Sequence, residues 1–96
     1  MINPHFLKYN KRNSFKLTFH ILKGNYKDLQ AKFGTNLKKI REGKEYSLRL
    51  LAAKCDLDDS QISKIENGKT NIQLSTIFEL ARGLGVDPKE LLDFKI

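Results

Sequence analysis

Residues 47–68 constrain the fold of this chain more than any other segment. Apolar side chains recur there at helical spacing in two short runs. The first run contains Leu48, Leu51, Ala52 and Cys55, and the second contains Ile62 and Ile65. The pattern predicts two helices of about nine residues each, joined by a turn of about three or four residues.

Both predicted helices begin at a residue whose side chain can accept a hydrogen bond from a free backbone N–H group. Ser47 precedes the first helix and Asp58 precedes the second. Asn67-Gly68 is typical of a helix end. Ala52 is small enough to let the two helices approach, and Leu57 can fill the angle between them. The segment therefore predicts a helix-turn-helix.

The second predicted helix has an outward face that is mostly polar. Once Ile62 and Ile65 face the core, the side chains left to project outward are Asp59, Ser60, Gln61, Ser63 and Lys64. A helix with polar residues exposed near its N-terminus fits the major groove of DNA.

A longer helix is predicted before this unit. Asn25 can cap it, and apolar residues at helical spacing follow from Leu29 to Ile40. Glycine weakens a helix interior, so we expect Gly34 to delay the regular helix until near Phe33. We expect Gly43 to end it.

Two more helices are predicted after the unit. The first begins near Ser75, buries Ile77, Phe78, Leu80 and Ala81, and ends at residues 83–85. The second begins at Asp87-Pro88, a cap followed by proline at the first helical position, and holds Leu91, Leu92 and Phe94. The expected fold is all-α, with five short helices in one compact domain over residues 25–96.

Residues 1–24 differ from the rest of the chain and form a basic N-terminal extension. They carry five basic residues and no acidic residue, whereas residues 25–96 carry 13 basic and 11 acidic residues. Within the extension, Phe15, Leu17, Phe19 and Ile21 alternate as on one face of a strand. The extension is either flexible or a short strand that docks on the domain or on a partner chain.

Other classes of protein find little support in the sequence. No apolar stretch is long enough for a membrane span or a secretory signal, so we expect a cytoplasmic protein. Gly68-Lys69-Thr70 resembles the end of a phosphate-binding loop, but Ser63 stands where that loop needs glycine. No catalytic constellation, metal spacing or cofactor motif is present, so neither an enzyme nor a metal site is expected. Cys55 can be a redox sensor or, as we expect, a core residue.

These residues make the chain similar to the Cro/phage-repressor (XRE-type) helix-turn-helix family over about residues 33–94. The most specific matches are Leu51-Ala52, Leu57, the run ISKIENG at 62–68, Leu80-Ala81 and Leu84-Gly85-Val86. The resemblance implies a five-helix lambda-repressor-like domain. It also implies a sequence-specific transcriptional regulator, which we expect to be a repressor that binds a palindromic operator through the major groove.

The resemblance also implies roles for single residues. Asp59, Ser60 and Lys64 match base-contacting positions, and Lys64 could donate to guanine O6 or N7. Positions at the groove edge or on phosphates are Ser47, Gln61, Ser63, Asn67, Lys69 and Asn71. Arg41 and Glu66 match a structural pair that orients the recognition helix.

The chain departs from the family pattern at three positions. Leu48 stands where many family members have a glutamine that contacts a phosphate. Asp58 and Asp59 put negative charge where the recognition helix meets DNA. Asp58 is expected as an N-cap, and Asp59 either accepts from cytosine N4 or supports the helix N-terminus electrostatically.

Two questions about protein partners stay open at this stage. The apolar residues after Asp87 either complete the monomer core or form the contact of a two-fold homodimer. We expect the homodimer, and we expect it to bind double-stranded DNA. An alternative function is that of an antitoxin, which represses its own operon and binds a toxin through residues 1–24.

Overall fold

The computed structural model describes residues 26–96. The predicted strand at residues 15–21 and the predicted cap at Asn25 lie outside the described residues. None of the described helices is long and apolar enough to cross a membrane.

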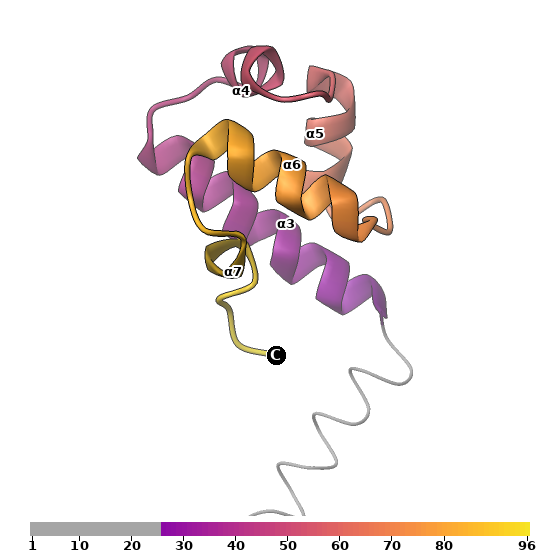
Figure 1. The fold of residues 1–96 in the computed structure, drawn as a ribbon. Helices are drawn as coiled ribbons and strands as arrows, with labels where there is room; N and C mark the ends of the chain where they lie inside the picture. Colours follow the sequence, from indigo (N-terminus) through magenta and orange to yellow (C-terminus); the bar gives the residue numbers. More distant parts are fainter. Residues whose placement is uncertain (1–25) are drawn as a thin grey trace, which may run out of the picture.

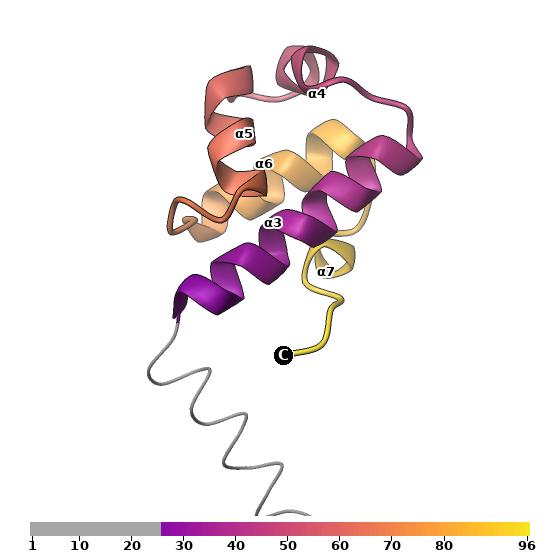
Figure 2. The ribbon, with the colours of Figure 1, turned by 180° about the vertical axis from the view of Figure 1, so that it is seen from behind.

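The described part of the chain folds into five helices, which confirms the all-α prediction. They are α3 (Tyr26–Gly43), α4 (Leu48–Lys54), α5 (Asp59–Glu66), α6 (Leu74–Leu84) and α7 (Pro88–Leu91). Figures 1 and 2 show α4 and α5 at one end of the molecule, next to the longer helices α3 and α6. The short helix α7 packs against both α6 and α3.

Three helices begin at the caps that the sequence predicts. Ser47 Oγ accepts from the N–H of Leu50 at 3.0 Å at the start of α4. Asp58 Oδ1 accepts from the N–H of Gln61 at 2.7 Å at the start of α5. Asp87 Oδ1 accepts from the N–H of Lys89 at 3.1 Å at the start of α7. These bonds satisfy backbone donors that have no partner within the helix.

Helix α3 corrects the expectation that Gly34 delays the regular helix. The helix is continuous from Tyr26 through Gly34 to Gly43. A Cβ atom at position 34 would lie 2.3 Å from the carbonyl oxygen of Ile65 and 2.5 Å from that of Glu66. Glycine is present because the backbones of α3 and α5 approach each other here, and this packing outweighs its cost to helix propensity.

The core lies between the five helices and is mainly aliphatic. Its fully buried large side chains are Leu37, Leu51, Ile62, Leu80, Leu84 and Leu91. The prediction that Phe78 is buried is wrong, because 56% of its surface is exposed. The four apolar residues within 77–81 lie on more than one face of α6, and of these Leu80 and Ala81 are buried in the core. Leu92 follows α7 and is also exposed, whereas Phe94 is half-buried against the core.

Candidate nucleic-acid interface

A buried ion pair fixes α5 on α3. Arg41 Nε donates to Glu66 Oε2 at 2.6 Å, and Arg41 Nη2 donates to Glu66 Oε1 at 3.0 Å. This is a bidentate guanidinium–carboxylate contact, and both side chains are less than a tenth exposed. The predicted partners therefore meet, one from near the C-terminus of α3 and the other at the last residue of α5.

The rest of the Arg41 side chain holds the loop before α4. Its Nη1 donates to the carbonyl oxygen of Tyr46 at 2.6 Å. The hydrogen bonds to Glu66 raise the pKa of Arg41 above its ordinary value, and burial opposes this only in part. One guanidinium thus joins α3, α5 and the segment that leads into α4. Because it is buried inside the domain, its role is to position α5 rather than to contact a ligand.

Helix α5 presents an exposed polar side away from this pair. Ile62 and Ile65 are buried, whereas Asp59, Ser60 and Lys64 are exposed. Within residues 26–96, no side-chain hydrogen bond or ion pair engages Asp59, Ser60 or Lys64. The three predicted base-contacting residues therefore lie on one helix with their polar groups available to a ligand.

Two other predicted contact residues are already engaged within α5. Gln61 Oε1 accepts from the N–H of Asp58 at 2.9 Å, which completes a capping box. Asn67 Nδ2 donates to the carbonyl oxygen of Ser63 at 2.8 Å. Ser63 itself is half-buried. Gln61 and Asn67 thus stabilise the two ends of α5, a role that the sequence interpretation did not assign to them.

The loop after α5 is held against α3. Gly68 has φ +68°, a left-handed conformation, and a Cβ atom there would lie 2.8 Å from Cα of Ala31. The N–H of Lys69 donates to the carbonyl oxygen of Lys64 at 3.0 Å. The side chains of Lys69 and Asn71 are exposed on this loop, whereas Ser47 lies apart from it, at the start of α4.

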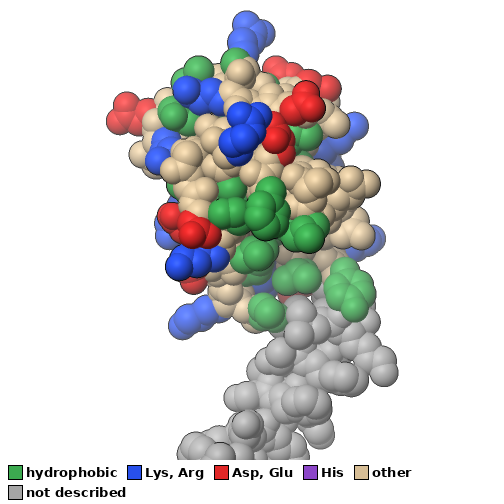
Figure 3. Space-filling model, viewed as in Figure 1, with side chains coloured by type: hydrophobic (Ala, Val, Ile, Leu, Met, Phe, Trp, Pro, Cys, Tyr) green, Lys and Arg blue, Asp and Glu red, His purple; other side chains and the backbone are tan. Residues whose placement is uncertain are grey.

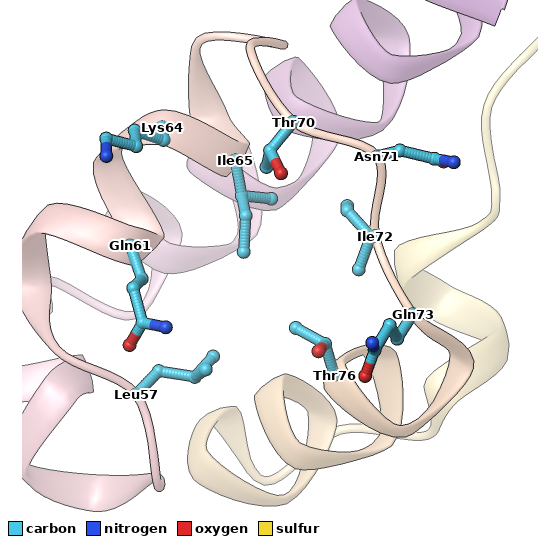
Figure 4. A pocket seen from close by; sticks show the side chains of 9 residues that line it. All are labelled: Leu57, Gln61, Lys64, Ile65, Thr70, Asn71, Ile72, Gln73 and Thr76. Atoms are coloured by element: carbon cyan, nitrogen blue, oxygen red, sulfur yellow. The ribbon is translucent and has the colours of Figure 1, made fainter.

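A pocket lies between α5, the loop and the start of α6 (Figure 4). Its volume is about 410 Å³. Its polar lining includes Gln61, Lys64 and Asn71, which the sequence predicts as contact residues, and Thr70, Gln73 and Thr76, which it does not. Thr70, Gln73 and Thr76 come to lie beside α5 through the packing of the loop and α6. No local sequence pattern therefore indicates that these three residues line the pocket.

A second surface feature is apolar and lies on α6 and after α7. Figure 3 shows hydrophobic side chains gathered over the middle of the face on which α6 and α7 lie. Leu74 is 70% exposed, and Phe78, Leu92 and Ile96 are each about half exposed. Monomeric proteins rarely leave such groups of large side chains uncovered.

Cys55 ends α4 and is half-buried against the core. A Cβ atom at Gly83 would lie 2.9 Å from the Cβ atom of Cys55, so α4 and α6 approach closely here. Burial raises the pKa of the Cys55 thiol above its ordinary value. Within residues 26–96, no cluster of His, Cys, Asp or Glu side chains could hold a metal ion.

Curated proteins with similar sequences are regulators. The chain is 41% identical over 68 residues to control protein C.BamHI of Bacillus amyloliquefaciens. This alignment covers 70% of this chain and 84% of that protein. It is 42% identical over 65 residues to control protein C.MunI of a Mycoplasma species, covering 67% and 88% of the two chains.

Two of the solved structures with similar folds are of restriction-modification controller proteins. The restriction-modification controller protein C.AhdI of Aeromonas hydrophila superposes with a TM-score of 0.63 at 37% identity, over 65% of this chain and 94% of that chain. Controller protein C.Esp1396I, solved as a tetramer in complex with its natural 35 base-pair operator, has a TM-score of 0.59 at 32% identity, over 68% and 96% of the two chains.

The family comparison agrees with the geometry of α4 and α5. The helix-turn-helix family model matches residues 37–91, which include all of α4, α5 and α6. The buried Arg41–Glu66 pair lies inside the matched region and holds the second helix of the motif in place. The chain belongs to the Cro/phage-repressor (XRE-type) helix-turn-helix family of DNA-binding transcriptional regulators.

Proposed function

We propose that this chain is a sequence-specific transcriptional regulator of the controller type, which binds duplex DNA with α5 in the major groove. The observation that carries the proposal is the exposed polar side of α5, set rigidly on α3 by a buried bidentate ion pair. The likeness to control proteins C.BamHI and C.MunI supports the controller role. The restriction-modification controller proteins C.AhdI and C.Esp1396I suggest control of a restriction-modification system as the regulatory context.

Base recognition is assigned to the exposed residues of α5. Lys64 donates to guanine O6 or N7, and Ser60 donates to or accepts from a neighbouring base. Asp59 lies in the first turn, where it either accepts from cytosine N4 or stabilises the helix N-terminus through its charge. The sequence of the operator depends on these three side chains.

Phosphate contacts are assigned to residues around the recognition helix. Lys69 and Asn71 extend from the loop after α5, and the Ser47 hydroxyl lies at the start of α4. Such contacts fix the register of a helix on DNA without depending on sequence. Three further residues support DNA binding by stabilising α5 through their hydrogen bonds and by offering their remaining polar atoms to the groove edge: Gln61, Ser63 and Asn67.

A homodimer completes this function. We assign the dimer contact to the exposed apolar side chains of Leu74, Phe78 and Leu92. A two-fold pair presents two copies of α5 to half-sites about one DNA turn, or 34–36 Å, apart. The operator is therefore a palindrome, and occupancy of that site, rather than a catalytic step, regulates transcription.

Selection of duplexes from a random pool with the purified full chain tests this proposal. We expect one enriched palindromic sequence. Lys64→Ala should reduce the preference for that sequence by about 1–3 kcal/mol. Lys69→Ala should weaken all sequences alike and lower the salt dependence, as the slope of log K against log salt, by about one. The proposal fails if no sequence is enriched and if the protein does not bind duplex DNA at low salt.

A further inference from the structure

A second pocket, the α3 pocket, lies between α3 and the C-terminal residues Phe94 and Lys95. Its volume is about 330 Å³, at the lower end of the range of about 300–1,000 Å³ that is usual for ligand pockets. The surface inside it is mostly apolar and includes Ala31 and Phe94. Phe94 is half-buried against the core, so one wall of the pocket is part of the packed domain.

Three lysines surround this apolar interior. Lys32 and Lys39 reach it from α3, and Lys95 reaches it from the end of the chain. None of the described residues that line the pocket is acidic. Within residues 26–96, no ion pair engages any of the three lysines. The α3 pocket therefore combines an apolar interior with three ammonium groups whose charge is available to a ligand.

The folded domain holds the pocket open without a ligand. Asn36 Nδ2, which also lines the pocket, donates to the carbonyl oxygens of Glu90 and Leu91 at 2.9 and 3.0 Å. Leu91 is fully buried, so the chain that leads to Phe94 is anchored on both α3 and the core. A ligand therefore meets a preformed site and does not have to order it.

The α3 pocket faces away from the recognition helix. At about 100° per residue, Lys32, Asn36 and Lys39 lie within about 60° of one another on α3 and about 140–160° from Gly34, where α5 packs. Figures 1 and 2 show α5 and the C-terminal residues on opposite sides of α3. The pocket therefore stays accessible when α5 lies in the major groove.

We propose that the α3 pocket binds an acidic peptide segment of a partner protein. An apolar side chain of that segment enters the pocket, and its neighbouring carboxylates pair with Lys32, Lys39 and Lys95. An apolar anchor in a pocket with charged groups at the rim is the usual arrangement of a peptide contact. The inference goes beyond the proposed function, since it gives the regulator a protein contact on the side opposite α5.

Two other occupants fit the pocket less well. A small molecule usually has 70–90% of its surface buried in its pocket, whereas Thr35, Lys39 and Lys95 are exposed, so this pocket is open on one side. The continuing backbone of a peptide covers such an opening. A second copy of this chain carries a net charge of +7. Its acidic turn at residues 56–59 holds one apolar residue, Leu57, which is packed against the core.

Selection of random twelve-residue peptides displayed on phage, with the full chain as the target, tests the proposal. We expect the enriched peptides to share an apolar residue with Asp or Glu within two positions of it. A labelled copy of one such peptide then serves as the probe in fluorescence anisotropy. Thr35 is exposed at the mouth of the pocket, so Thr35→Glu puts a carboxylate among the lysines. It should weaken peptide binding at least about ten-fold, and the size-matched control Thr35→Gln less than about three-fold.

A second pair of variants removes positive charge. Lys32→Gln with Lys39→Gln takes two charges from the pocket, and Lys38→Gln with Lys44→Gln takes two from exposed positions that do not line it. Loss of two exposed ion pairs should weaken peptide binding about two- to thirty-fold, and the control should weaken it less than about two-fold. The difference between the two variants should shrink in 1 M salt, because salt screens exposed charges.

Enrichment of no acidic peptide overturns the proposal, and so do equal losses of binding in Thr35→Glu and Thr35→Gln. A change of oligomeric state in Thr35→Glu, measured by sedimentation, would show a contact between copies instead. A weaker salt dependence of DNA binding in the Lys32 and Lys39 variant alone would show a DNA contact instead. If the wild type binds the peptide but not duplex DNA, the proposed function fails and this inference stands. Circular dichroism checks that each variant is folded.

Discussion

Replacing Gly34 by alanine tests whether the approach of α3 to α5 determines the residue at this position. An alanine Cβ atom would lie 2.3 Å from the Ile65 carbonyl oxygen, and real Cβ atoms essentially never come within 3.0 Å of another atom in this way. The two backbones would have to separate by roughly 0.7 Å, the difference between these distances. The obstructing atoms are backbone, so no side-chain rotation can relieve the contact.

The expected change in stability follows from two opposing effects. Overpacking of this kind costs about 1–3 kcal/mol, and a backbone obstacle favours the upper end of that range. Alanine gains about 1 kcal/mol over glycine in a helix interior. Gly34→Ala should therefore lower the free energy of unfolding by about 2 kcal/mol in urea denaturation.

Gly43→Ala on the same helix is the matched control. A Cβ atom there meets nothing within 4 Å, so this variant should be as stable as the wild type or more stable by up to about 1 kcal/mol. If Gly34→Ala also keeps or raises the free energy of unfolding, close packing against α5 does not explain the glycine.

Three further substitutions or modifications test other parts of the structure. Arg41→Ala leaves the Glu66 carboxylate buried without its partner and should lower the free energy of unfolding by about 3–5 kcal/mol. The double replacement Arg41→Met with Glu66→Leu removes both charges and should lower it clearly less. Equal losses in the two variants would refute the explanation by an unpaired buried charge. Asp58→Ala should cost about 1 kcal/mol because α5 loses its N-cap, and an unchanged stability on urea denaturation would contradict that role. Because burial raises the pKa of Cys55 above its ordinary 9.0, the folded protein should hold the protonated thiol at pH 8 and react with iodoacetamide more slowly than the urea-unfolded protein; equal rates would count against this.

Local chemistry in the sequence is sufficient to predict most of the helices. Ser47, Asp58 and Asp87 cap their helices because a short oxygen-bearing side chain needs only the next few residues to make its bond. Gln61 follows the same logic, since a glutamine three residues after Asp58 is the pattern of a capping box. The spacing alone therefore indicates the bond of Gln61 within α5, although the family resemblance assigns that residue to the groove edge.

The errors arise where a distant part of the chain determines the outcome. The backbone of Ile65 and Glu66 determines that position 34 is glycine, and helix propensity carries no information about that contact. Phe78 belongs to a run of apolar residues that lie on more than one face of α6. Which of these side chains are exposed therefore depends on the positions of the neighbouring helices. The pocket residues Thr70, Gln73 and Thr76 come together for the same reason.

The short helix α7 determines when this domain can fold during synthesis. Leu91 is fully buried, and Asn36 Nδ2 donates to the carbonyl oxygens of Glu90 and Leu91 at 2.9 and 3.0 Å, so α3 is held by residues made more than fifty positions later. During synthesis the chain emerges from its N-terminus onward, so Glu90 and Leu91 must leave the ribosome before α3 has its last neighbour. The core therefore closes only after α7 has left the ribosome, and a ribosome stalled before that point carries a domain whose core is still open.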